Sequence, residues 1–325
     1  MRAKRKTERG IALLATLMGI ALMTIAVMDL TSTAMLGARA AANQANELRA
    51  AYLARSGVNV GLALLAQHTR QQAAQNEPPV EGLNQEWSAP YPAIPVGGGF
   101  ASVSIVDEER KLDINYLVNP DGSQNAQFEP VLERLFVTLG ISIDLIPAII
   151  DWLDPDSVPD GPTGAEADYY MRLFPPYAPR NGPMPTIGDL RMIRGVDDPT
   201  FMKLSRVLTV FAMQQPTGDQ QLPKVNINTA PPEVIVSLAP DLAASPSLMD
   251  QFLAARTEQP LGTGGEQSPG LTQLIASAGA SFTYRSNLFT IEGRGSYAGA
   301  RKLVFATVVH QNTPGPSQLL QWRED

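Results

Sequence analysis

Six carboxylates occur within the 18 residues from 151 to 168, a density that suits cation binding or acid–base chemistry. No Lys or Arg occurs between Arg134 and Arg172, so these carboxylates would repel one another unless they were solvated, protonated or bound to a cation. Hard oxygen ligands on a loop with Pro and Gly suit Ca²⁺, which accepts irregular geometry and high coordination numbers. The candidate ligands are Asp151, Asp154, Asp156, Asp160, Glu166 and Asp168.

The spacing of these carboxylates leaves other interpretations open. The segment is not an EF-hand loop, because the fifth and sixth positions counted from Asp154 are Val158 and Pro159. It could be a solvated acidic loop in which Asp residues cap helices, as Asp168 could. It could also catalyse hydrolysis, by metal assistance or by paired carboxylates acting as acid and base. Spacing alone does not select the ligands.

Composition excludes several other kinds of site. The 325 residues contain no cysteine, which excludes disulfides, thiolate zinc sites and cysteine nucleophiles. His68 and His310 are the only histidines, so a multi-histidine metal site is excluded and a Ser-His-Asp triad would need one of these two. The net charge of -7 disfavours broad nucleic-acid binding through phosphates. The length suggests about two domains.

The chain begins with a basic leader and a long apolar run. Residues 1–10 contain five bases and one acid, and residues 11–28 are uncharged. The bases predict that this end stays in the cytoplasm, and the run reaches the lower limit for a membrane-spanning helix. It is longer than the apolar core of a secretory signal. An ordinary signal anchor on a periplasmic protein is the alternative interpretation.

Helix-forming residues continue well beyond the apolar run. No proline occurs before Pro78, and Ala, Leu, Gln and Arg are frequent. We therefore expect one helix over residues 11–75, of about 60 residues and ~90 Å. Apolar positions after residue 50 predict that its second half packs on a globular domain.

The remainder has strand patterns at both ends and helix patterns between them. Residues 76–98 are rich in Pro and Gly and predict an extended loop. Strands are predicted at 101–106, 111–116, 288–293 and 302–309, with a glycine-rich turn between the last two. Candidate helices lie at 131–140, 146–153, 186–196, 198–211, 231–239 and 247–256.

This order of elements predicts an α+β fold. A small antiparallel sheet, built from residues 76–124 and 281–310, would carry an inserted all-helical domain at 125–280. The polar tail, residues 311–325, is expected to be loose.

Several motifs together resemble a known family. The leader that ends at Gly10 resembles the class III signal of type IV pilin-like proteins, which prepilin peptidase cuts, here between Gly10 and Ile11. The motif KLDINYL at 111–117, the stretch from IIDWLDPDS to MIRGV at 149–196, and KVNINTAPPEVIVSLAP at 224–240 resemble the minor pseudopilin K family of type II secretion systems.

The resemblance implies a minor pseudopilin without catalytic activity. It implies a single-pass inner-membrane protein with a periplasmic globular part, and methylation. It implies a complex with the minor pseudopilins I and J at the tip of the pseudopilus, which exports folded proteins across the outer membrane. It also supports calcium in the helical domain, which we expect to be structural. From the net charge we expect no nucleic-acid partner. The alternative is a membrane-anchored periplasmic metal-dependent hydrolase that uses the carboxylates of 151–168.

One position departs from the pattern of pilin-like proteins. Most of them have Glu at the fifth mature position, where this chain has Ala15. A buried carboxylate is costly unless it is paired. In the family, the carboxylate of this Glu is thought to pair with the N-terminal amine of the preceding subunit. A subunit with alanine there can begin an assembly, because nothing ahead of it has to satisfy a carboxylate.

Two further motifs have structural interpretations. VNINTAPPEVIVSL resembles the opening of DNA-binding helix-hairpin-helix modules, but SLAPDLAASPSL after it lacks their glycine hairpin. We expect packing only, with Asn228 or Thr229 capping a helix. The aromatic stretch YYMRLFPPY, residues 169–177, fits a partner-binding patch or, more commonly, core and loop packing.

Overall fold

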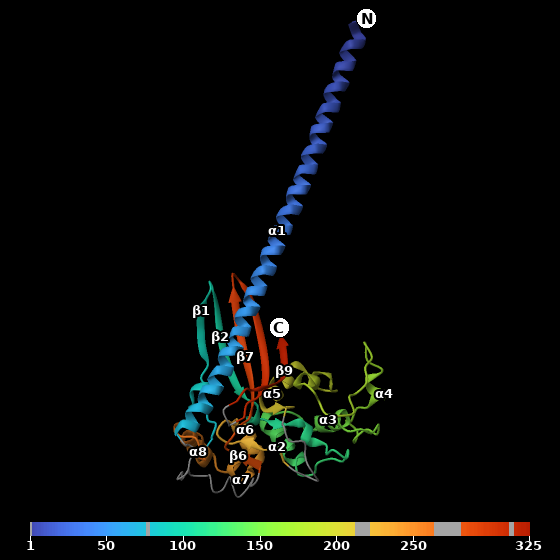
Figure 1. Cartoon of the computed structure of the whole chain (residues 1–325). Helices are drawn as coiled ribbons and strands as arrows, with labels where there is room; N and C mark the ends of the chain where they lie inside the picture. Colours follow the sequence, from blue (N-terminus) through green and yellow to red (C-terminus); the bar gives the residue numbers. More distant parts are fainter. Residues whose placement is uncertain (1, 76–78, 212–221, 263–280, 312–314) are drawn as a thin grey trace.

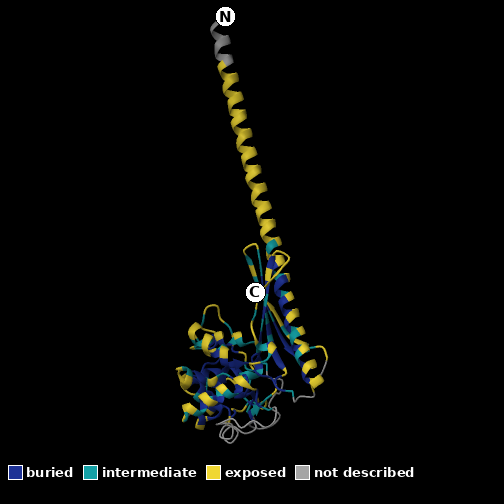
Figure 2. Ribbon diagram, turned by 90° about the vertical axis from the view of Figure 1, so that its left-hand side faces the viewer, coloured by how far each residue is buried: buried dark blue, intermediate teal, exposed yellow. Residues whose placement is uncertain are grey.

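One long helix projects from a globular part made of a sheet and a helical domain (Figure 1). The computed structural model describes residues 2–75, 79–211, 222–262, 281–311 and 315–325. Helix α1 runs from Arg2 to Gln75. Its residues 10–45 are exposed, whereas its last third packs on the sheet (Figure 2).

The sheet has five antiparallel strands in the order β1-β2-β7-β8-β9. Alternate residues of the central strands point toward α1, and Val103, Ile291 and Ala306 form one core with Ala54 and Val58 of the helix. The strands are β1 (Tyr91–Val96), β2 (Gly99–Asp107), β7 (Leu288–Tyr297), β8 (Ala300–Val309) and β9 (Gln318–Glu324).

Two glycines in β7 allow the helix to approach closely. A Cβ atom at Gly293 or Gly295 would collide with the backbone oxygen of Ala54 or Ala50. Only glycine permits this distance between the backbones of strand and helix. The sheet therefore holds α1 by backbone proximity as well as by apolar side chains.

The helical domain lies in sequence between β2 and β7. Its core includes Phe128, Leu132 and Phe136, and α2 packs on α6, where Arg134 Nε donates to Ser237 O at 2.7 Å. The helices are α2 (Glu129–Leu139), α3 (Ile146–Leu153), α4 (Ala167–Tyr170), α5 (Asp198–Val207), α6 (Pro232–Leu238), α7 (Pro240–Ala243) and α8 (Pro246–Glu258). Two short parallel pairs, β3 (Leu112–Asp113) with β4 (Leu208–Thr209) and β5 (Val225–Asn226) with β6 (Phe282–Thr283), complete the domain.

The α+β prediction of a long N-terminal helix, an antiparallel sheet and helices between its strands is confirmed. The strand predicted at 111–116 was wrong. Its only strand is the two-residue β3, and Ile114–Leu117 forms a 3₁₀ turn because the Asp113 carboxylate accepts a hydrogen bond from Asn115 N at 2.8 Å. The helix predicted at 186–196 is also a 3₁₀ segment, Ile187–Met192.

Two boundaries of the sheet also differ from the prediction. Strand β1 occupies part of the expected loop at 76–98, despite Pro92 and Pro95, because an edge strand tolerates missing N–H donors. The turn between β7 and β8 lies later than its glycines suggested. Ala298 and Gly299 make it with positive φ angles, whereas Gly293 and Gly295 remain within β7.

The expectation of a loose tail at 311–325 was wrong, because β9 adds to the sheet beside β8. Arg55 of α1 donates two hydrogen bonds of 2.9 Å to the Glu324 carboxylate, and the Arg323 guanidinium lies over the Phe305 ring. These contacts join the end of the chain to a helix and a strand far away in sequence, which a local pattern does not reveal.

Candidate functional site

The acidic segment connects the end of α3 with the start of α4. Asp151 lies in the last turn of α3, and Asp154 is the residue that ends it. One carboxylate oxygen from each of Asp154, Asp156 and Glu166 lies within 4.8 Å of the others. The structure therefore brings three of the six predicted ligands into one group, which we call the acidic triad.

Two members of the triad have buried carboxylate oxygens without a hydrogen-bond donor. Oδ1 of Asp154 and both carboxylate oxygens of Glu166 have no partner in the part of the chain that the structure describes. Burial and then the neighbouring carboxylates raise the pKa of Asp154 to about 6 and that of Glu166 to about 7. Buried carboxylates without donors are costly unless a cation or a proton neutralises them. The triad thus fits a hard divalent cation.

Asp151 is buried beside the triad, but its carboxylate accepts hydrogen bonds from the backbone of the loop. Its Oδ1 accepts from Asp160 N at 2.8 Å, and its Oδ2 accepts from Ala165 N at 2.5 Å. A Cβ atom on Gly164 would collide with Oδ2, so the loop passes Asp151 closely. These bonds fold residues 155–165 back and bring Glu166 to the end of α3.

The last two predicted ligands, Asp160 and Asp168, lie outside the triad. The backbone N–H of Asp160 donates a hydrogen bond to the Asp151 carboxylate. Asp168 is exposed and lies within α4, so the interpretation of Asp168 as a helix cap was wrong. The residue before α4 is Glu166, whose side chain makes no capping hydrogen bond.

Two residues that the carboxylate pattern does not indicate bind the loop from outside the acidic segment. Asn181, at φ +48°, donates from Nδ2 to Asp156 O, and Arg194 donates from Nη1 to Gly164 O at 2.9 Å. The dipeptide Asn181-Gly182 is a turn signal that could have identified the first of them. Arg194 has no comparable local signal, since its partner lies 30 residues earlier.

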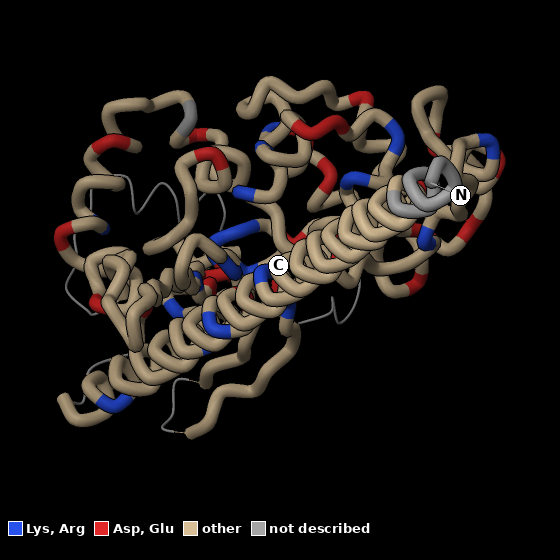
Figure 3. The backbone as a smooth tube through the Cα atoms, turned by 90° about the horizontal axis from the view of Figure 1, so that it is seen from above, with Lys and Arg blue, Asp and Glu red and all other residues tan. Residues whose placement is uncertain are grey.

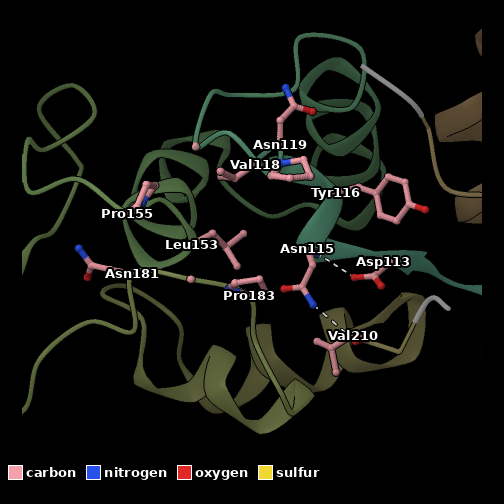
Figure 4. A pocket seen from close by; sticks show the side chains of 13 residues that line it. Asp113, Asn115, Tyr116, Val118, Asn119, Leu153, Pro155, Asn181, Pro183 and Val210 are labelled. Atoms are coloured by element: carbon pink, nitrogen blue, oxygen red, sulfur yellow. Dashed lines mark hydrogen bonds between the residues drawn. The ribbon is translucent and has the colours of Figure 1, made fainter. Parts of the chain in front are cut away.

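A pocket of about 280 Å³ has Asn181 and Pro155 among its lining residues (Figure 4). Asn115 ties its walls together: its Oδ1 accepts from Met184 N at 2.7 Å and its Nδ2 donates to Met184 O at 3.1 Å. The lining residues include amides, prolines and Asp113, but no Ser, Thr, His, Lys or Glu.

The segment Asn226–Thr229 joins the helical domain to the sheet. Asn228 exchanges two hydrogen bonds with Leu261, of 3.0 and 2.8 Å, and Thr229 Oγ1 donates to Asp107 Oδ2. The prediction that Asn228 or Thr229 caps a helix was wrong. Helix α6 begins at Pro232 after Pro231, without a side-chain cap, because both polar residues are used in these longer-range contacts.

The aromatic stretch at 169–177 divides into packed and exposed residues. Tyr170 is buried, with its ring centroid 5.4 Å from that of Trp152 and 5.3 Å from that of Tyr177. Phe174 is fully exposed. Packing therefore accounts for Tyr170 and Tyr177 but not for Phe174.

The projecting half of α1 contains the predicted cleavage and assembly residues. Gly10, Ile11 and Ala15 are exposed on it. Asp29 is the only charged residue between Gly10 and Arg39. Most of the projecting helix is accordingly free of Lys, Arg, Asp and Glu (Figure 3). Within the described residues, Gly10–Gln75 is the one helix long and apolar enough to cross a membrane, with a mean hydropathy of 2.4 in its best window. The hydroxyl groups of its threonines bond to helix carbonyls, as Thr24 Oγ1 does to Ile20 O at 2.8 Å.

A long apolar N-terminal helix whose second part packs on an antiparallel sheet defines the class of pilin-like proteins. Models of the type II secretion system protein K family match residues 110–213 and 225–291, together more than half of the chain. The chain belongs to this family, the minor pseudopilins predicted from its motifs.

Curated relatives and a solved structure agree with this assignment. The type II secretion system protein K of Pseudomonas aeruginosa is 25% identical over 315 residues, 94% of this chain and 89% of that protein. The protein K of Klebsiella pneumoniae is 28% identical over 259 residues, 77% of this chain and 75% of that protein. A chain of the GspK-GspI-GspJ complex from enterotoxigenic Escherichia coli has the same fold, with a TM-score of 0.67 and 17% identity, over 88% of this chain and 99% of that chain. The family does not favour the hydrolase alternative.

Proposed function

We propose that this subunit begins and caps the pseudopilus at its tip, as a non-enzymatic part of the machinery that exports folded proteins across the outer membrane. The observation that carries the proposal is the shape of the chain. The apolar half of α1 is free to pack in the membrane and the assembly, and the large helical domain lies at the opposite end of the helix (Figure 1). A bulky domain fits the tip because no further subunit stacks on it.

Prepilin peptidase would cut between Gly10 and Ile11, and methylation would follow. The mature helix would then anchor the chain in the inner membrane, with the globular part in the periplasm. The related complex contains GspI and GspJ, and we expect the corresponding minor pseudopilins I and J to pack on the face of residues 11–28. Ala15 suits a first subunit because it leaves no buried carboxylate to be satisfied from ahead.

The acidic triad would hold a structural calcium ion. Asp154, Asp156 and Glu166 would be its carboxylate ligands, since two of them have buried oxygens without donors. Bound Ca²⁺ would supply the positive charge that neutralises them. Asp151 would keep the loop folded through its bonds to Asp160 and Ala165. We do not expect Asp160 or Asp168 to coordinate the calcium ion.

The experiment is to determine the intact mass and N-terminal sequence of the chain from membranes, with and without active prepilin peptidase. The proposal predicts a start at Ile11 that depends on the peptidase, and co-purification of pseudopilins I and J. An uncut Met1, or a cut beyond Met28, would contradict the pseudopilin function. Loss of co-purification in Ala15→Glu, with Ala12→Glu as control, would test the role of the fifth position.

A further inference from the structure

The two edges of the sheet differ in their capacity to pair with another strand. Strand β1 has Pro92 and Pro95, which lack the N–H groups that a neighbouring strand needs. Strand β9 contains no proline, and among the described residues no strand lies beyond it. An edge strand without such protection is a template for pairing with another chain.

The backbone of β9 has regularly spaced groups directed away from the sheet. Leu303 and Asp325 exchange two hydrogen bonds, of 3.1 and 3.0 Å. Hydrogen-bonded and non-hydrogen-bonded pairs alternate in an antiparallel ladder, so Trp322 and Glu324 direct their N–H and C=O groups away from β8. The free edge therefore offers donors and acceptors at Trp322 and Glu324, in the part of β9 that pairs with β8 before the register shift between Thr307 and Val308.

Apolar side chains surround this edge. Leu319, Leu320 and Trp322 are 53%, 41% and 42% exposed. Trp322 pairs with Ala306, which lies in the core beneath α1, so Trp322 points to the helix side of the sheet. Its Nε1 donates to Glu324, which is bound by Arg55 of α1. The free edge of β9 is thus linked to the adjacent side of α1.

We propose that β9 is the pairing edge for an extended strand of a second, different pilin-like subunit anchored in the same membrane. The inference rests on the proposed function and adds where and how the partner binds. Backbone hydrogen bonds along β9 would supply affinity, and the apolar ledge of Leu319, Leu320 and Trp322 would supply specificity.

Direction disfavours antiparallel pairing of β9 with the β9 of a second copy of this chain. Glu324 bonds to Arg55 and Ser317 bonds through His310 to Thr69, so β9 runs antiparallel to α1 and toward the membrane end. Antiparallel pairing of two β9 strands would point the two α1 helices in opposite directions, and both could not enter one membrane. If a second copy were oriented in the same way, its free β1 edge would run parallel to β9. That edge contains Pro92 and Pro95, which lack the N–H groups needed for pairing. We therefore expect an antiparallel partner strand, which runs away from the membrane and lies on a different subunit.

The test uses the full-length chain co-expressed with pseudopilins I and J. Trp322→Lys places a charge on the free edge, and Ile94→Lys is the matched control on β1, where Ile94 is 47% exposed. We expect recovery of I and J to fall about tenfold or more with Trp322→Lys and to change less than about twofold with Ile94→Lys. Equal recovery with Trp322→Lys and wild type would overturn the inference and leave the proposed function standing. No recovery with the wild-type chain would overturn both.

Amide hydrogen exchange tests the pairing without a substitution. The amides of Trp322 and Glu324 should exchange freely in the chain alone and about tenfold or more slowly in the complex, whereas that of Arg323 should be protected in both. Unchanged exchange at Trp322 and Glu324 in the complex would overturn the inference. So would a dimer of the chain cross-linked to itself through Trp322→Cys, which would be its only cysteine.

Discussion

Buried carboxylates occur in two regions, the acidic triad and the junction between the sheet and the helical domain. At the junction, several protein groups donate hydrogen bonds to a buried carboxylate. Asp107 Oδ2 accepts hydrogen bonds from Asn226, Thr229 and Ser286, and its Oδ1 accepts one from Glu109 N. In the triad, both oxygens of buried Glu166 have no donor.

The same contrast extends to the neighbours of Asp107. Glu81 accepts from Ser286 N at 2.7 Å and Glu109 accepts from Asn287 N at 2.7 Å. Burial raises the pKa of Glu81 to about 8 and that of Glu109 to about 7. A raised pKa therefore does not distinguish the two regions. The supply of hydrogen-bond donors does distinguish them: the junction carboxylates have protein donors, whereas the orphaned oxygens of the triad suit the proposed cation.

The largest expected effect comes from removing the acceptor at the junction. Asp107→Ala leaves the side chains of Asn226, Thr229 and Ser286 without their shared acceptor, and it should lower the free energy of unfolding by about 3–5 kcal/mol. Urea unfolding of the chain in detergent would measure the loss, and added Ca²⁺ should not restore it. A loss below ~1 kcal/mol would contradict the role given to Asp107.

Removal of calcium should have the next largest effect. With free Ca²⁺ at 100 times the dissociation constant, binding contributes about 2.7 kcal/mol of stability, which a chelator would remove. Thermal unfolding with and without the chelator measures this, and Mg²⁺ serves as the control because it requires stricter octahedral geometry. The same melting temperature under both conditions would contradict a structural ion.

Without calcium, acid should stabilise the triad. The pKa of Glu166 is raised to about 7 in the folded chain, so the folded state binds a proton more tightly than the unfolded state. This contribution is full below the unfolded pKa and is lost as pH rises from about 4.5 to 7, by about 2 kcal/mol. The difference between wild type and Glu166→Gln, unfolded in chelator at several pH values, isolates it from Glu81 and Glu109. A flat difference would argue against the buried, unpaired carboxylate.

The smallest effect should come from an exposed acid of the same loop. Asp168 lies outside the triad, so Asp168→Asn should change the free energy of unfolding by less than about 0.5 kcal/mol, with or without calcium. Calcium-dependent melting of this variant checks the choice of ligands. A loss of the calcium response would mean that Asp168 contributes to the site.

Local pattern predicted much of the fold. Uninterrupted helix formers before Pro78 predicted α1, and apolar periodicity predicted α2, α3 and α5. It did not predict β9, because the pairing with β8 and the bond from Arg55 depend on residues distant in the chain.

The composition of the acidic segment predicted a candidate site but not its members. Asp151 and Glu166 are both acidic and buried. Asp151 accepts hydrogen bonds from the N–H groups of Asp160 and Ala165, whereas the carboxylate oxygens of Glu166 have no donor among the described residues. That difference arises from how the loop folds back, which the spacing of carboxylates does not encode.

Calorimetric titration of the mature chain with Ca²⁺, beside Glu166→Gln, tests the central contrast most directly. We expect one saturable binding event in wild type, which Glu166→Gln weakens at least ~30-fold while the chain stays folded, because a neutral amide replaces a carboxylate ligand. Equal affinity in the two proteins would contradict the assignment of the triad. So would the absence of binding in wild type.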